Sequence, residues 1–321
     1  MAESSQPQEN SALDPFRFFS MPDRNPPAFA FGFFGSTEQQ SLPLPPPPPC
    51  QEVFPEKVPS FLKSTIECVN LNGGITLLKG KVSAYEVFGV PNSDLLPGKY
   101  EGGLKLWEGS LDLIKILHSE LRDGHLSLTG KKVLELGCGH GLPGIFTSIE
   151  GAAVIHFQDF NAEVLRCLTI PNVKANLPRS LVQGESSHKF EADANVSSKV
   201  RFFAGDWSEV HNLLLPVSES TPNASSKQGH QSDGYDVILM AETVYSVASL
   251  KSLYGLMKKC LRSPDGVVYL SAKKHYFGVG GGTRQFCSLV EEDGAMASCL
   301  VAEVADGSSN VREVWKFSYR Q

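Results

Sequence analysis

Several marks of other protein classes are missing from this 321-residue chain. No uninterrupted apolar run reaches the ~18 residues that a membrane-spanning helix needs. The seven cysteines are scattered without a Cys-x-x-Cys pair, which disfavours a secreted disulfide scaffold or a zinc ribbon and favours a reducing compartment. We therefore expect no bound metal ion. The formal net charge is −6, with 35 acidic and 29 basic residues, so a general nucleic-acid-binding protein is not expected.

The first part of the chain, residues 1–60, differs in composition from the rest. It contains the run Pro45–Pro49 and many Ser and Gln residues, without a helical or strand period. Such a segment buries too little apolar surface to fold, so we expect a disordered tail with polyproline character near 43–49. Its start lacks the basic and apolar regions of a signal peptide. The aromatic run 29–34 is interpreted either as unstructured or as a short docking motif.

From residue 64 onward the chain has the patterns of a folded domain, expected to span 64–321. Alternation over 67–78 and 81–87, joined through glycines, suggests a short β meander. Leucine and isoleucine then recur at helical spacing and predict an amphipathic helix over 109–122. These elements form an N-terminal extension, 64–125, of the domain.

Apolar runs and helical patterns alternate along the remaining chain. The predicted strands are 133–137, 154–158, 199–204, 235–240, 266–271, 301–304 and 311–318, and the predicted helices are 142–150, 162–176, 246–261 and 282–292. Pro171 predicts a break or kink in its helix. This rhythm is typical of an α/β fold with a Rossmann-like seven-stranded sheet, mostly parallel and ending in an antiparallel hairpin. The polar stretches 180–198 and 216–234 are expected to be surface loops.

The most informative motif follows the first of these strands. Val133–Leu136 runs directly into Gly137-Cys138-Gly139-His140-Gly141, and Pro143 suits the first turn of the helix after it. Glycines allow a sharp turn and a close approach of the backbone to a ligand. The motif therefore predicts a nucleotide-like ligand at the carboxyl end of the strand, where sheets of this kind bind their ligands.

Acidic residues at three successive strand ends narrow the choice of ligand. Glu135 precedes the loop, Asp159 ends the second strand, and Asp206-Trp207 follows the third. A carboxylate at the first position would repel a pyrophosphate but attract the methionine ammonium of S-adenosylmethionine (SAM). Asp159 suits ribose hydroxyls, and Trp207 offers a surface for adenine. We expect SAM as the cofactor; a nicotinamide-dependent oxidoreductase, which uses a similar loop, is the alternative.

Three motifs together resemble the histidine protein methyltransferase family, a branch of the seven-strand SAM-dependent methyltransferases. They are Tyr100-Glu101-Gly102-Gly103-Leu104-Lys105-Leu106-Trp107-Glu108, Gly205-Asp206-Trp207 and Met240-Ala241-Glu242-Thr243-Val244-Tyr245. The resemblance covers roughly 64–321. It implies methylation of a histidine ring nitrogen in a protein substrate, with a large-subunit ribosomal protein as the known kind of target. It also implies a protein of the cytoplasm, the nucleus or both, and we expect a monomer without a membrane partner.

The strand-end residues and the resemblance together give the candidate site. The resemblance implies that Gly137 and Gly139 hold the methionine part of SAM and that Ala241 lies near the sulfur. The candidate cofactor-binding residues are Trp107, Glu135, Gly137, Cys138, Gly139, Asp159, Asn161, Gly205, Asp206, Trp207 and Ala241. The candidate catalytic residues are Glu242 and Tyr245, which match a family motif that usually begins with Asp, one methylene shorter than Glu.

Methyl transfer from a sulfonium needs little more than a lone pair aligned behind the S–CH₃ bond. A histidine, with a pKa of about 6.5, is mostly neutral at pH 7, whereas a lysine, at about 10.4, must first lose a proton. Glu242 or a nearby backbone carbonyl could accept the N–H of the other ring nitrogen. The residues themselves do not separate these acceptors. They also leave open an RNA or small-molecule methyltransferase and a non-catalytic assembly factor or chaperone.

Structural roles compete for several of these residues. Trp107 could pack in the core, Tyr245 could pack against the following helix, and Glu242 could be a favourable charge at a helix N-terminus. The stretch 273–276 is either a solvated sheet edge or a substrate contact, and the Gly-rich stretch 278–282 suggests a loop that gates the pocket.

Overall fold

The computed structural model describes residues 46–55, 65–71, 73–89, 94–182, 199–215, 234–305, 307 and 310–320. All of them belong to one unit, Leu44–Gln321. The aromatic run 29–34 and most of the two predicted surface loops lie outside the described residues. No helix in the described part of the chain is long and apolar enough to cross a bilayer.

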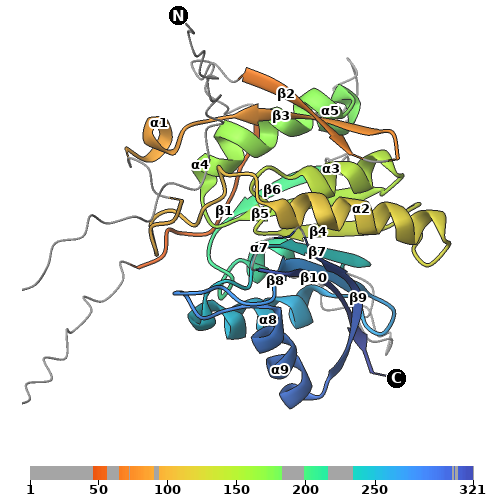
Figure 1. Ribbon diagram of the computed structural model, residues 1–321. Helices are drawn as coiled ribbons and strands as arrows, with labels where there is room; N and C mark the ends of the chain where they lie inside the picture. Colours follow the sequence, from red (N-terminus) through yellow and green to blue (C-terminus); the bar gives the residue numbers. More distant parts are fainter. Residues whose placement is uncertain are drawn as a thin grey trace, which may run out of the picture. The chain divides into compact units, whose positions relative to one another are not determined.

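A mixed eight-stranded sheet forms the centre of this unit (Figure 1). In spatial order its strands are β1 (Gln51–Glu52), β6 (Val200–Ala204), β5 (Val154–Asp159), β4 (Lys132–Leu136), β7 (Val237–Ala241), β8 (Val267–Lys273), β10 (Arg312–Tyr319) and β9 (Met296–Val304). The five strands from β6 to β8 are parallel, whereas β1 and β10 run antiparallel to their neighbours. The predicted mostly parallel sheet with a C-terminal antiparallel hairpin is confirmed. The strand β1 was not predicted, because it lies inside the segment expected to be disordered.

Helices cover both faces of the sheet (Figure 1). They are α2 (Glu108–Arg122), α3 (Leu142–Ile149), α4 (Ala162–Val164), η2 (Leu165–Thr169), α5 (Ile170–Asn176), α6 (Arg179–Val182), α7 (His211–Leu214), α8 (Val247–Cys260) and α9 (Thr283–Asp293). Both faces of the central strands are buried: Val133 packs with the α2 and α3 side, and Leu134 with the α8 and α9 side. This two-sided burial explains the continuous apolar runs of the parallel strands.

The N-terminal extension is a hairpin followed by a helix, not a β meander. β2 (Thr65–Leu71) pairs antiparallel with β3 (Ile75–Lys81), but the predicted strand at 81–87 is the helix α1 (Ala84–Phe88). The Ser83 side chain accepts a hydrogen bond from Tyr85 N (3.2 Å), and Gly89 ends the helix in a left-handed conformation. These two capping features outweigh the weak alternation of the sequence.

The helical segment around Pro171 changes its winding instead of breaking. The π-helical turn η2 joins α4 to α5, and Pro171 lies in the first turn of α5. A proline has no N–H and its ring clashes with the carbonyl four residues earlier, and a widened turn relieves this conflict. The predicted break or kink at Pro171 is thus a π turn.

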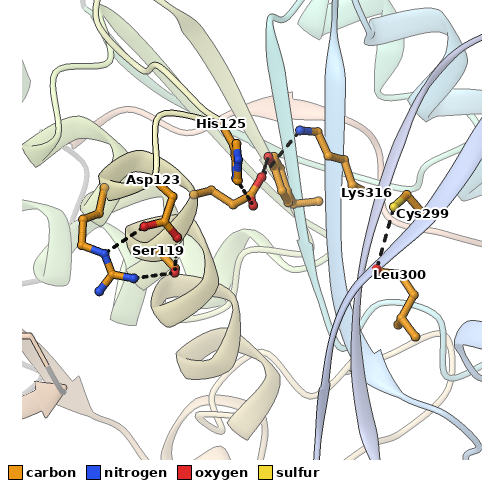
Figure 2. A network of polar contacts seen from close by, with 9 residues as sticks. Ser119, Asp123, His125, Cys299, Leu300 and Lys316 are labelled. Carbon is orange, nitrogen blue, oxygen red and sulfur yellow. Dashed lines mark hydrogen bonds and ion pairs between the residues drawn. The ribbon is translucent and has the colours of Figure 1, made fainter.

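The C-terminal end of α2 is held by a small polar network (Figure 2). Ser119 Oγ donates to Asp123 Oδ2 at 3.1 Å, which closes the helix end. Glu120 lies within 3.5 Å of His125 and 3.6 Å of Lys316, and the Tyr269 hydroxyl donates to it at 2.9 Å. Because Lys316 lies on β10 and Tyr269 on β8, this network fixes α2 to the sheet. At its N-terminal end, α2 begins directly after Trp107.

Candidate active site

A cavity of about 580 Å³ lies at the carboxyl ends of β4, β5, β6 and β7. The strand order reverses between β4 and β7, and sheets of this type bind ligands at such a switch point. The cavity is lined by the Gly-rich loop after β4, the turns after β5, β6 and β7, and the segment that precedes α2. Its volume lies in the range of small-molecule and cofactor sites.

The Gly-rich loop presents bare backbone to this cavity. Gly137, Gly139 and Gly141 have positive φ angles of 60°, 49° and 70°. A Cβ on Gly139 would lie 2.9 Å from the carbonyl oxygen of Gly103, so the loop approaches the segment before α2 this closely only because position 139 is glycine. Thr169 in η2 holds the loop from below, because its hydroxyl donates to Gly139 O at 2.6 Å.

Asp159 at the end of β5 is buried and lines the cavity. Its Oδ2 accepts a hydrogen bond from Gly139 N (2.9 Å) and its Oδ1 accepts one from Asn161 N (3.0 Å). Burial raises the pKa of Asp159 to about 6, although these backbone donors lower it. Each carboxylate oxygen retains a second lone pair, so Asp159 remains able to accept hydrogen bonds from a ligand.

The turn after β6 contributes Gly205, Asp206 and Trp207 to the lining, as predicted from their place in the sequence. Gln158, which was not predicted, connects this turn with the Gly-rich loop. Its Oε1 accepts hydrogen bonds from Trp207 Nε1 (2.9 Å) and Gly137 N (3.3 Å), while its Nε2 donates to Gly205 O (2.9 Å). One fully buried amide therefore sets the relative positions of the two turns.

Glu242, directly after β7, has the unusual backbone angle φ 57° for a residue with a side chain. Its N–H donates to Ser271 O at 2.8 Å, and the Tyr276 hydroxyl donates to its Oε2. Its Oε1 is buried and has no partner within the described part of the chain. Gly109 leaves room for this oxygen, since a Cβ there would lie 2.7 Å from it. Burial raises the pKa of Glu242, and the Tyr276 hydrogen bond lowers it.

Tyr245 and Trp107 also line the cavity, together with Glu101, which was not singled out from the sequence. The Tyr245 hydroxyl donates to Glu101 Oε2, and Gly98 N donates to Glu101 Oε1 at 2.8 Å. Burial and the neighbouring Glu101 raise the pKa of Tyr245, so its hydroxyl stays protonated near neutral pH. Trp107 is half-buried at the start of α2, which argues against the alternative that it packs only in the core.

Two predicted cofactor residues do not line the cavity. Glu135 Oε2 accepts a hydrogen bond from Gly144 N (2.8 Å) beneath the loop, and burial raises the pKa of Glu135 to about 8. Asn161 donates to Lys99 O (2.9 Å) and accepts from Glu101 N (3.2 Å), so it fastens the segment before α2. In the structure each of these side chains is hydrogen-bonded to backbone that shapes the cavity. Their contact with a cofactor stays a prediction.

The other loop residues have no reactive character. Cys138 lines the cavity, but burial raises the pKa of its thiol well above the usual value, so a thiolate is not formed. Burial also lowers the pKa of His140 to about 4, and its Nε2 lies 3.1 Å from Leu104 O. Within the described residues, no group of three or more His, Cys, Asp or Glu side chains is arranged to hold a metal ion.

The charged residues among those that line the cavity are mostly acidic. They are Glu101, Asp159, Asp206 and Glu242, against Lys105 alone as a basic residue. Such a lining disfavours a pyrophosphate, which carries negative charge, and favours a ligand with positive charge. The strand order, the bare glycine loop and the acidic strand ends define the Rossmann-like methyltransferase class of α/β proteins.

Comparison with known proteins finds similar chains that are named as methyltransferases. No family model matches it. It is 41% identical over 222 residues to a Dictyostelium discoideum histidine protein methyltransferase 1 homolog, covering 69% of this chain and 59% of that protein. A Bos taurus protein of the same name is 36% identical over 269 residues, covering 81% of this chain and 65% of that protein. The T. thermophilus 16S rRNA N2 G1207 methyltransferase structure aligns over 80% of this chain and 51% of that chain, with 15% identity and a TM-score of 0.44.

By sequence, the chain is similar to histidine protein methyltransferase 1 homologs, which confirms the resemblance found in its motifs. The chain spans about three-fifths of the length of the curated relatives it matches, 59% and 65% for the two named here.

Proposed function

We propose that this protein is a SAM-dependent methyltransferase that modifies a ring nitrogen of a histidine in a protein substrate. The similarity to histidine protein methyltransferase 1 homologs supports the histidine, and a large-subunit ribosomal protein is the first substrate to test. The observation that carries the acceptor assignment is the buried Oε1 of Glu242, a residue that lines the cavity; this oxygen has no partner among the described residues. A buried carboxylate oxygen without a donor is costly, and a bound ring N–H would satisfy it.

The described residues fit SAM as the cofactor. When bound, SAM supplies an electrophilic methyl group on a positively charged sulfonium. The four carboxylates of the lining suit that charge and the ammonium of the methionine part. Asp159 would accept from the ribose hydroxyls, and the loop at Gly137 and Gly139 has no side chain to obstruct the methionine part. Asp206 and Trp207 would hold the adenine. A nicotinamide dinucleotide fits less well, because Lys105 is the only lining cation within the described residues.

Glu242 would orient the acceptor ring. The left-handed backbone, the bond to Ser271 and the Tyr276 hydroxyl hold its carboxylate with one oxygen free. By accepting the N–H of one ring nitrogen, Oε1 would select the tautomer whose other nitrogen carries the lone pair for attack. The same hydrogen bond would stabilise the positive charge that develops on the ring during transfer. A neutral histidine needs no stronger base.

The decisive experiment incubates the full chain with methyl-labelled SAM and ribosomal or whole-lysate protein, then identifies the labelled amino acid after hydrolysis. We expect methylhistidine from the wild type and its loss from Asp159→Ala, with the fold of the variant checked by circular dichroism. Methyllysine as the sole product would refute the histidine assignment. Equal labelling with the Asp159→Ala variant would refute the cofactor site, and SAM binding without transfer to any protein would favour an assembly factor or chaperone.

A further inference from the structure

The segment 46–55, here called the N-terminal strap, is fixed to the edge of the central sheet. β1 pairs antiparallel with β6, with Gln51 opposite Ala204 and Glu52 opposite Phe203. Val53 N donates to Phe202 O at 2.8 Å, and the Val53 side chain is only 2% exposed. The strap thus covers the edge of the sheet on the side where the parallel strands end.

Side chains add to this backbone pairing. Arg201 binds Glu52 through two hydrogen bonds, Nε to Oε1 and Nη2 to Oε2, both at 2.8 Å. Gln51 Oε1 accepts from Arg166 Nη2 at 3.1 Å, and Lys174 Nζ donates to Pro55 O at 2.9 Å. The forked geometry of the Arg201–Glu52 pair gives it a defined direction, which a single contact would not.

The direction of β1 determines what the strap does at the cavity. Because β1 is antiparallel to β6, the residues before Gln51 continue past Ala204 toward the carboxyl end of the sheet. Cys50 therefore lies against Gly205, where an added Cβ would overlap its sulfur. Beyond Cys50 the chain reaches the cavity, which Pro46 and Pro47 line together with Asp206 and Trp207. A parallel β1 would have carried these prolines to the opposite end of the sheet.

Prolines suit a wall at this place. Each ring fixes φ and removes an N–H donor, so the segment is stiff and presents apolar rings without an N–H that needs a partner. A stiff wall loses little conformational entropy when a ligand binds against it. Pro48 and Pro49 belong to the same run but do not line the cavity, so the wall is specific to two of the prolines.

We propose that the N-terminal strap is part of the cofactor site: Pro46 and Pro47 form the wall that covers the nucleoside end of bound SAM, and β1 with the Glu52–Arg201 pair holds this wall in place. The proposal rests on the proposed function, since it takes the cofactor to be SAM and the turn at Asp206 to be its adenine side.

The first test measures binding of SAM and of S-adenosylhomocysteine to the full chain by calorimetry. The double variant Pro46→Gly/Pro47→Gly removes the wall, and we expect its Kd for both ligands to rise roughly five- to tenfold. Pro48→Gly/Pro49→Gly is the matched control, because it loosens the same proline run without touching the lining, and its Kd should stay within twofold of the wild type, roughly the scatter of such measurements.

The second test uses the ion pair. Glu52→Arg and Arg201→Glu each place like charges opposite one another, and each should raise the Kd of SAM. The double variant Glu52→Arg/Arg201→Glu restores opposite charges and should recover most of the affinity. The proposal is overturned if Pro46→Gly/Pro47→Gly binds SAM like the wild type, if the Pro48 and Pro49 control weakens binding equally, or if the charge swap recovers nothing. A wild type that binds no SAM overturns the proposed function as well, which separates the two failures.

Discussion

At the scale of single residues, the chemistry proposed here depends on the ionisation of Glu242. Burial raises the pKa of this carboxyl above its usual value, while the hydrogen bond from the Tyr276 hydroxyl lowers it. A group with a raised pKa is ionised only above that pKa. A reaction that needs the carboxylate is therefore lost as the pH falls through the pKa of Glu242. By lowering this pKa, the Tyr276 hydrogen bond extends the reaction to lower pH.

The variant Tyr276→Phe removes the lowering hydrogen bond, so the pKa of Glu242 rises further. We expect the acid limb of the kcat profile to move to higher pH by roughly one unit, with a smaller change in rate on the alkaline side. The profile would be measured with a histidine-containing substrate. Tyr254→Phe is the control: it also loses a tyrosine–carboxylate bond, of 2.7 Å to Asp293, but this bond does not involve Glu242 and lies outside the cavity lining. An unmoved acid limb in Tyr276→Phe would contradict the role given to Tyr276.

At the scale of elements, the π turn η2 supports the cofactor loop. It places the buried Thr169 hydroxyl against Gly139 O at 2.6 Å. Thr169→Val keeps the shape of the side chain but leaves this loop carbonyl without its donor. We expect a loss of about 1–2 kcal/mol in unfolding free energy and a several-fold weaker binding of SAM.

Thr147→Val is the matched control for this variant. The Thr147 hydroxyl is equally buried and donates to Gly144 O at 2.8 Å, but within α3 and away from the cavity lining. Both variants should lose stability in urea titrations, and only Thr169→Val should weaken SAM binding in calorimetry. Equal binding by the two variants would show that η2 does not support the loop.

The elements also show what the sequence can and cannot predict. The central strands and the Gly-rich loop follow from local patterns, because buried parallel strands are continuously apolar and a bare turn requires glycine. The residues at strand ends could be placed in one site because parallel strands end on the same edge. The sequence could not place three further residues in this site, because their roles depend on contacts between turns that are distant in the chain. These residues are Glu101, Gln158 and Tyr276. β1 is only two residues long and follows a proline run, so no period marks it.

Glu135 also shows that the sequence does not determine the contacts of a side chain. The sequence places Glu135 directly before the loop, but it does not say which way the side chain of a strand residue points. The carboxyl faces Gly144 under the loop, where burial raises its pKa to about 8. The carboxyl predicted to contact a ligand thus also accepts a hydrogen bond from the helix that follows the loop.

At the scale of the whole molecule, buried titratable groups shape the dependence of stability on pH. Burial raises the pKa of Glu135 to about 8, so the folded state holds a proton that the unfolded state releases. The contribution of Glu135 to the free energy of unfolding therefore falls as the pH rises toward 8. Burial lowers the pKa of His140 to about 4 and that of His156 to about 3, and these two residues have the opposite effect. Their contribution to the free energy of unfolding is complete above pH 6.5 and is lost as the pH falls.

Above pH 6.5 the histidines no longer change the stability, so the remaining decline toward pH 8 comes from carboxyls with raised pKa values, and chiefly from Glu135, whose pKa of about 8 lies in this range. Glu135→Gln stays neutral and keeps an oxygen for Gly144 N, and we expect it to flatten that decline in urea midpoints. Glu313→Gln is the control, because hydrogen bonds from Thr283, Trp315 and Arg284 outweigh burial and lower the pKa of Glu313. That variant should lose stability without a change in slope, and a wild-type slope in Glu135→Gln would contradict the assignment.

The boundary of the folded unit gives the last prediction. Leu44–Gln321 form one unit, whereas the sequence pattern alone placed the start of the domain at 64. A chain that begins at Leu44 keeps the N-terminal strap and should match the full chain in Tm and in SAM affinity.

A chain that begins at Phe61 loses buried Val53, the β1 pairing and the Glu52–Arg201 pair. Burial of one valine is worth about 2 kcal/mol, so its Tm should fall by roughly 5 °C or more in calorimetric scans. Because β6 would then become an exposed edge strand, the shorter chain should also aggregate more readily, visible in light scattering at equal concentration. An unchanged Tm and affinity for the chain from Phe61 would mean that the strap contributes neither to the sheet nor to the cofactor site.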